Sequence, residues 1–124
     1  MTASNKETAL DFLRLVTAGE IDSAYDAYVA TGMRHHNAWF AAGADALREA
    51  MKAAHVQQPD KIFEVKQAIA DGDRVAVHSH LRFKPEDPGL AVVHIFRFEA
   101  GRIAEMWDLV MQVPALSPNA DGLF

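Results

Sequence analysis

The sequence of 124 residues lacks several features, and each absence excludes a class of function. It contains no cysteine, so neither disulfide bonds nor thiolate chemistry is available. Acidic residues outnumber basic ones by 17 to 12, and the net charge of −5 argues against nucleic acid or an anionic membrane as a partner. No apolar run approaches the roughly 18 residues of a membrane span, and no signal-peptide pattern opens the chain. We expect a cytoplasmic protein that binds neither nucleic acid nor membrane.

Motifs for phosphate binding and for serine nucleophiles are also missing. No glycine-rich phosphate loop occurs, and there is no G-x-S-x-G nucleophile elbow. Half of the residues are hydrophobic, and a chain of this length buries roughly two-thirds of its unfolded surface. These features predict a single domain over residues 1–124 with its own apolar core.

Apolar residues recur at helical spacing in the first half of the chain. Ser4 opens a capping-box pattern, and the repeat behind it ends at Gly19. Asp22 is expected to cap a short second helix, and a third helix is predicted over residues 44–56. The segment 31–43 mixes glycine, histidine, asparagine and tryptophan without a period, which predicts a loop.

From Ile62 onward the apolar residues recur with a period of two, which is typical of β-strands. Four strands are predicted, over residues 62–70, 74–84, 90–98 and 102–112. The tail, 114–124, holds prolines and glycine and is expected to be irregular. Helices followed by an antiparallel sheet predict an α+β fold, with three helices packed on one face of a curved, mainly antiparallel sheet.

Two polar residues, His94 and Asp108, interrupt the apolar pattern of the last predicted hairpin. Side chains alternate between the faces of a strand, so the register decides whether these two share a face. A three-residue loop would pair Phe98 with Arg102 and set His94 opposite Met106, which brings the imidazole and the carboxylate to one side. A two-residue turn would separate them, because a slip of one residue reverses every side chain.

Two further histidines, His78 and His80, project to one side of their own strand. If the turn at 85–89 pairs residue 83 with residue 91, His80 lies opposite His94. Three imidazoles and Asp108 would then line one concavity. The alternative is that His78 and His80 lie on a solvated or dimer-forming face.

Other residues are expected to complete a pocket. In the predicted loop, His36 is expected to reach the pocket mouth and donate to a substrate oxygen, whereas His35 is expected to be exposed. Trp39 is expected to form a wall of the pocket. Phe96 and Met106 follow the faces of His94 and Asp108 and are expected to contact the ligand.

A carboxylate among apolar neighbours is destabilising unless it is hydrogen-bonded or protonated. Asp108 in such a setting is suited to general acid or base catalysis. Two simpler readings stay open for it: it caps a backbone amide, or it pairs with Arg97 or Arg102. For His94 the simpler reading is a core histidine bonded to a main-chain carbonyl.

Three stretches give the chain a family resemblance: residues 34–37, 75–80 and 95–108. They resemble SnoaL-like proteins of the NTF2-like superfamily, which are related to polyketide cyclases. The resemblance implies a conical α+β barrel with a deep apolar pocket, and a homodimer built on the outer face of the sheet. Asp108 and His94 match the aspartate and histidine that serve an intramolecular aldol condensation in the cyclases. Ala38 stands where the subgroup often has proline.

The leading hypothesis is therefore cofactor-free acid/base chemistry on a small apolar carbonyl compound. Asp108 would remove a proton alpha to the carbonyl, and His94 or His80 would stabilise the enolate oxygen. A second hypothesis is a zinc or iron site built from His78, His80, His94 and Asp108. A third is a ligand-binding or dimerisation module without catalysis.

Overall fold

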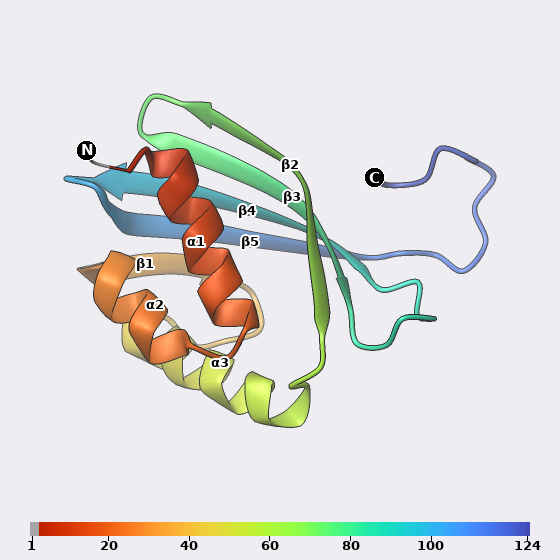
Figure 1. Ribbon diagram of the computed structural model, residues 1–124, viewed down its shortest axis with the longest axis horizontal. Coiled ribbons are helices and arrows are strands. Elements are labelled where there is room, and N and C mark those ends of the chain that lie inside the picture. Colours follow the sequence, from red (N-terminus) through yellow and green to blue (C-terminus); the bar gives the residue numbers. More distant parts are fainter. Residues whose placement is uncertain (1–2) are drawn as a thin grey trace.

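The computed structural model describes residues 3–124 as three helices and one five-stranded sheet. In chain order the elements are α1 (Asn5–Thr17), α2 (Ile21–Tyr28), β1 (Val29–Asn37), α3 (Ala44–Gln57), β2 (Ile62–Asp71), β3 (Arg74–Arg82), β4 (Leu90–Glu99) and β5 (Arg102–Gln112). The helices lie over one face of the curved sheet (Figure 1). This arrangement confirms the predicted α+β class. Within residues 3–124, no helix has the length and apolarity that crossing a membrane requires.

The sheet has the strand order β1-β5-β4-β3-β2, and only the β1–β5 pairing is parallel. The loop predicted over residues 31–43 is wrong for its first half, because β1 runs through Asn37. The buried positions in β1 alternate, but two of the three inward residues, His35 and Asn37, are polar. Hydropathy therefore gives no alternating signal in this strand, although its burial alternates.

The first helix begins as the sequence predicts. The Ser4 hydroxyl oxygen accepts a hydrogen bond from the Glu7 backbone amide at 3.1 Å, which satisfies one of the free amides of the first turn. Phe12 and Leu13 project from α1 into the core. The second helix differs from expectation, because α2 starts at Ile21 and Asp22 lies in its first turn without capping it.

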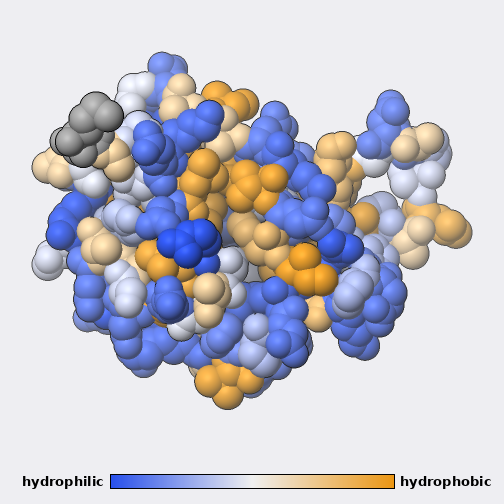
Figure 2. All heavy atoms as spheres, viewed as in Figure 1, coloured by the Kyte–Doolittle hydropathy of each residue, from blue (hydrophilic) through white to orange (hydrophobic). Residues whose placement is uncertain are grey.

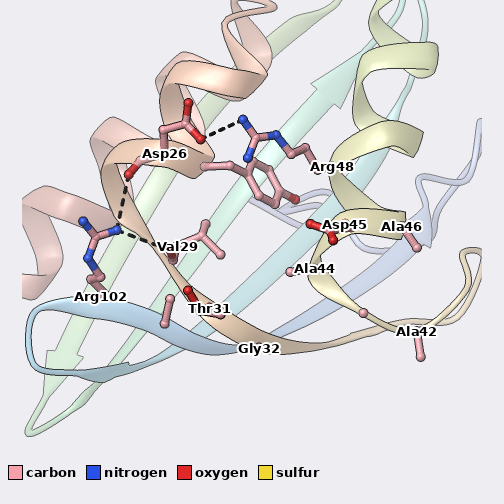
Figure 3. Close-up of a pocket in the computed structure, with 13 residues that line it drawn as sticks. Asp26, Val29, Thr31, Gly32, Ala42, Ala44, Asp45, Ala46, Arg48 and Arg102 are labelled. Carbon is pink, nitrogen blue, oxygen red and sulfur yellow. Dashed lines mark hydrogen bonds and ion pairs between the residues drawn. The ribbon is translucent and has the colours of Figure 1, made fainter.

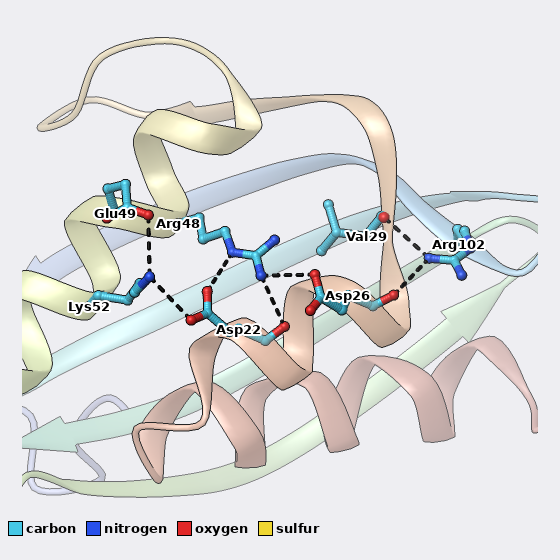
Figure 4. A network of polar contacts seen from close by, with 7 residues as sticks. All are labelled: Asp22, Asp26, Val29, Arg48, Glu49, Lys52 and Arg102. Carbon is cyan, nitrogen blue, oxygen red and sulfur yellow. Dashed lines mark hydrogen bonds and ion pairs between the residues drawn. The ribbon is translucent and has the colours of Figure 1, made fainter.

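Asp22 belongs instead to an ion-pair network that joins α2 to α3 (Figure 4). Arg48 on α3 contacts Asp22 at 2.7 Å and Asp26 at 2.8 Å. Lys52, one turn further along α3, contacts Asp22 at 3.2 Å and Glu49 at 3.3 Å. The network holds the two helices side by side at the edge of the core.

The hairpin between β4 and β5 has a two-residue turn, so the predicted three-residue loop is wrong. Glu99 pairs with Arg102, and the central residues Ala100 and Gly101 have φ values of 50° and 77°. Positive φ at both central positions is the geometry of a type I′ turn. Taken alone, this turn would put His94 and Asp108 on opposite faces.

A β-bulge restores the shared face. Phe98 pairs with Ile103, but the next pair joins Arg97 to Glu105, so Ala104 is an extra residue on β5. The bulge shifts the register by one residue and sets His94 directly opposite Asp108. The predicted shared face is confirmed, although the route to it differs.

The register between β3 and β4 places His78 and His80 on the other face of the sheet. Leu81 pairs with Leu90, so His80 lies opposite Ala91 and Val77 lies opposite His94. The predicted pairing of residue 83 with 91 differs from this register by an odd number of residues, which reverses every side chain. The prediction that three imidazoles line one concavity with Asp108 is therefore wrong.

The core lies between the helices and the inner face of the sheet, which is the face that carries His94. Phe96 is fully buried and packs edge-on against Phe12, with ring centroids 5.9 Å apart. Met33 of β1, Val75 and Val77 of β3, and Ile103 and Met106 of β5 complete this layer.

The left-handed conformation of Ala100 predicts a stabilising substitution. Residues other than glycine, asparagine and aspartate are strained there by about 1–2 kcal/mol, so Ala100→Asn should raise the free energy of unfolding by about 0.5–1 kcal/mol. Gly101→Ala is the matched control and should lower it by at least about 1 kcal/mol, although open space surrounds Gly101. Urea unfolding measures both; a loss of stability in Ala100→Asn would contradict the turn geometry.

Candidate functional site

A cavity of about 420 Å³ lies between α1, α3 and the inner face of the sheet. Its walls are mostly apolar, and they include Leu13, Met51, Phe63, Leu81, Val92 and Val110. Hydrophobic side chains also gather near the middle of the molecular face that carries α1 and β2 (Figure 2). His94, Asp108 and Asn37 line the same cavity and bring polar groups into this apolar setting.

Asn37 holds one oxygen of the Asp108 carboxylate. The parallel pairing of β1 with β5 sets these two residues side by side, and Asn37 Nδ2 donates to Asp108 Oδ2 at 2.7 Å. The amide itself is oriented, because Asn37 Oδ1 accepts from the Trp39 backbone amide at 3.0 Å. Asn37 is thus a site residue that the sequence did not predict. Its pairing with Asp108 depends on β1, and the sequence pattern predicts a loop there.

The other carboxylate oxygen, Asp108 Oδ1, is shielded from solvent and has no hydrogen-bond partner among residues 3–124. It lies 3.6 Å from His94 Nε2, slightly beyond hydrogen-bond distance. The alternative that Asp108 pairs with an arginine is wrong, because Arg97 contacts Glu99 and Glu105 instead, and Arg102 donates to backbone carbonyls. The free oxygen therefore faces the imidazole.

His94 is held by aromatic packing rather than by a backbone carbonyl. Its ring stacks on Phe96 with centroids 5.9 Å apart and lies 6.2 Å from the ring of Phe63. Its Nδ1 is buried and finds no hydrogen-bond partner in the described part of the chain. Burial lowers the pKa of His94, and the opposing attraction of Asp108 is the smaller effect. The imidazole is consequently neutral at physiological pH.

His35 is buried, so the expectation that it is an exposed loop residue is wrong. Its Nε2 lies 2.7 Å from the Ala41 carbonyl, and its Nδ1 accepts from the Asn37 backbone amide at 3.2 Å. These two contacts fix the tautomer, with the proton on Nε2. They hold the segment from Asn37 to Ala41 against His35 and thereby support the position of Asn37.

The other predicted ligand-binding histidines lie on the outer face of the sheet. His36 contacts Glu105 at 2.6 Å and stacks on Trp107. His78 and His80 both stack on Phe124 of the C-terminal tail, with centroid distances of 5.4 Å and 4.2 Å. None of the three histidines lines the cavity of His94.

The metal-ligand set considered from the sequence therefore does not assemble. His78 and His80 lie across the sheet from His94 and Asp108. Across residues 3–124, no three histidine, aspartate or glutamate side chains lie close enough together to hold a metal ion.

The remaining expected pocket residues divide between wall and core. Trp39 lines the cavity and is 80% exposed, at its outer rim. Phe96 and Met106 are buried in the core layer and are not among the residues that line the cavity. Their contact with a ligand stays a prediction, and the structure shows them supporting His94 and the bulged strand.

A larger cavity, of about 570 Å³, lies between α2, β1 and the start of α3 (Figure 3). Its arginines are already engaged: Arg48 contacts Asp22 and Asp26, and Arg102 donates to the carbonyls of Asp26 and Val29 at 3.3 Å. Neither the imidazole nor the carboxylate of the first cavity reaches it. The smaller cavity therefore holds the candidate site.

The fold and the pocket define a helix-covered, curved-sheet domain with a polar pair inside an apolar cavity. Residues 9–106 match the family model described as a SnoaL-like domain, and the chain belongs to this family. The resemblance noted in the sequence is thereby confirmed. No curated protein matches the chain.

Solved structures with the same fold include several SnoaL-like and NTF2-like proteins. A cystatin-fold protein from Novosphingobium aromaticivorans shares 22% identity over 86% of this chain and 98% of its own, with a TM-score of 0.72. A SnoaL-like polyketide cyclase from Agrobacterium tumefaciens shares 17% over 89% and 93%, with a TM-score of 0.72. AclR, a putative hydroxylase from Streptomyces galilaeus, shares 18% over 90% and 91%, with a TM-score of 0.74. At these identities the likeness shows the fold alone.

Burial of His94 predicts that stability falls as the pH is lowered. The folded-state pKa lies below the ordinary value of 6.5, so below that pH the unfolded chain binds a proton that the folded chain excludes. The free energy of unfolding should fall by up to about 1.4 kcal/mol per pH unit until the folded-state pKa is reached. His94→Gln should remove this contribution.

Urea unfolding at about pH 7.5 and about pH 5.5 measures the effect, because the ordinary histidine pKa of about 6.5 lies between these values. The free energy of unfolding of wild type should fall from about pH 7.5 to about pH 5.5 by more than that of His94→Gln. An equal fall in both proteins would show that the His94 pKa is the same in the folded and unfolded states.

Proposed function

We propose that this SnoaL-like protein catalyses cofactor-free proton transfer on a small apolar carbonyl compound, as an aldol cyclisation or an isomerisation. The observation that carries the proposal is the Asp108 carboxylate, with one oxygen bound by Asn37 and the other facing a neutral imidazole in an apolar cavity. Such a carboxylate is oriented for proton transfer, and the surrounding apolar walls suit a hydrophobic substrate.

Each group in the pair has a defined task in this reaction. Asp108 Oδ1 takes the proton alpha to the carbonyl; the electrons of the C–H bond form the carbon–carbon double bond, and the negative charge moves to the oxygen. His94 is neutral and donates a hydrogen bond to this enolate oxygen. The enolate carbon then attacks a second carbonyl, whose oxygen becomes an alkoxide and takes the proton back from Asp108, or Asp108 returns the proton to another carbon. His80, the alternative donor in the sequence analysis, lies on the other face of the sheet.

The proposal is tested by exchange of the alpha protons of a bound ketone in D₂O, with α-tetralone as the probe and NMR as the readout. The wild-type protein should accelerate the exchange, and Asp108→Asn should lower the rate by about 10²- to 10⁴-fold because the amide is not a base. Asp45→Asn, which changes a carboxylate in the larger cavity, is the matched control and should exchange at the wild-type rate.

Equal exchange in wild type and Asp108→Asn would remove Asp108 from the mechanism. Binding of α-tetralone without exchange would favour a second function, ligand binding without turnover. One observation supports that second function: Asp108 Oδ1 is shielded from solvent, so a substrate must displace neighbouring atoms to reach it.

We further propose that the protein acts as a cytoplasmic homodimer that pairs through the outer face of the sheet. Leu109 and Met111 project there from β5 and are 57% and 58% exposed, an apolar surface that a second copy would cover. Leu109→Lys and Met111→Lys should each shift the protein from dimer to monomer in sedimentation velocity. Val56→Lys, at an exposed position on α3, is the control; a wild-type monomer would contradict the dimer.

A further inference from the structure

Ser79 is a polar residue within the apolar inner face of β3. Its neighbours on that face are Val77 and Leu81, and Ser79 itself is fully buried. Its hydroxyl oxygen has no hydrogen-bond partner among the described residues. A buried hydroxyl without a partner is destabilising, so its presence requires an explanation.

The sheet register places Ser79 on the same face as His94, at a diagonal position on the neighbouring strand. Phe63 of β2 pairs with Leu81, and His94 of β4 pairs with Val77, so Ser79 lies on β3 midway between these two registers. Strands two apart are separated by about 9–10 Å, yet the rings of Phe63 and His94 are 6.2 Å apart. Both rings therefore lean toward each other across the strand that carries Ser79.

Two unpartnered polar atoms thus lie on the same face of adjacent strands, at diagonal positions. One is the Ser79 hydroxyl oxygen and the other is His94 Nδ1. Diagonal side chains on neighbouring strands are within reach of each other when one of them is long or aromatic. A hydroxyl is a donor and Nδ1 of a neutral imidazole is an acceptor when the proton is on Nε2, so the two atoms are chemically complementary.

We propose that Ser79 is a positioning residue for His94: its hydroxyl donates a hydrogen bond to Nδ1 and, together with the Asp108 carboxylate, which can only accept, keeps the imidazole proton on Nε2. Rotation about the Ser79 Cα–Cβ bond, which has three staggered minima, is the motion that joins the two atoms. The hydrogen bond on one ring nitrogen decides which tautomer the other presents. The effect on turnover rests on the proposed function, because only Nε2–H can serve the enolate oxygen there.

The tautomer of His94 is measured directly by the ¹⁵N shifts of its two ring nitrogens in the labelled protein without any ligand. Wild type should show a single tautomer with the proton on Nε2. Ser79→Ala should weaken this preference and raise the population of the tautomer protonated on Nδ1, although Asp108 still faces Nε2. Ser79→Thr, which retains the hydroxyl, should restore the single tautomer, whereas Ser79→Val, of nearly the same shape, should not.

The Thr and Val variants add the same volume to the core, so packing changes cancel in their comparison. An unchanged His94 tautomer in Ser79→Ala, or identical spectra for the Thr and Val variants, would overturn the proposal. In α-tetralone exchange, Ser79→Ala should lower kcat with little change in KM. Since the spectra need no substrate, absence of exchange in the wild-type protein would contradict the proposed function and leave the positioning role standing.

Discussion

The candidate site depends on one extra residue in β5. Without the bulge at Ala104, the type I′ turn at Ala100 and Gly101 would direct Asp108 away from His94 and into the outer face of the sheet. With the bulge, Asp108 lies directly opposite His94 on the inner face of the sheet. The bulge thus reconciles a tight turn, which favours a two-residue loop, with a polar pair inside the cavity.

Placing a carboxylate in an apolar cavity opposes folding unless other groups compensate. The parallel pairing of β1 with β5 supplies that compensation, because it aligns Asn37 with Asp108 and satisfies one oxygen. His35 supports this arrangement, because its ring hydrogen-bonds to the Ala41 carbonyl and the Asn37 backbone amide and so holds the chain at the end of β1. The other oxygen is left to the imidazole, which burial keeps neutral. A neutral donor beside an unengaged carboxylate oxygen is the state that the proposed proton transfer requires.

Much of the fold could be predicted from periodicity, because three helices and four strands carry clear apolar repeats. The strand β1 could not, since His35 and Asn37 occupy inward positions and hide the alternation. The site was predictable to the level of a shared face for His94 and Asp108. The role of Asn37 could not be predicted, because it depends on the pairing of β1, which the sequence pattern did not reveal. The face occupied by His78 and His80 depends on the length of the turn between β3 and β4, which the pattern does not determine.

That last dependence shows how strongly turn geometry determines the available chemistry. Had the connection between β3 and β4 differed by one residue, His78 and His80 would share the cavity with His94 and Asp108, and four N/O ligands would favour a transition metal. In the observed register the outer histidines stack on Phe124, and the cavity retains one imidazole and one carboxylate. Two such groups suffice for moving a proton within an organic substrate, and this is why acid/base chemistry is the reaction class that we propose for the inner face.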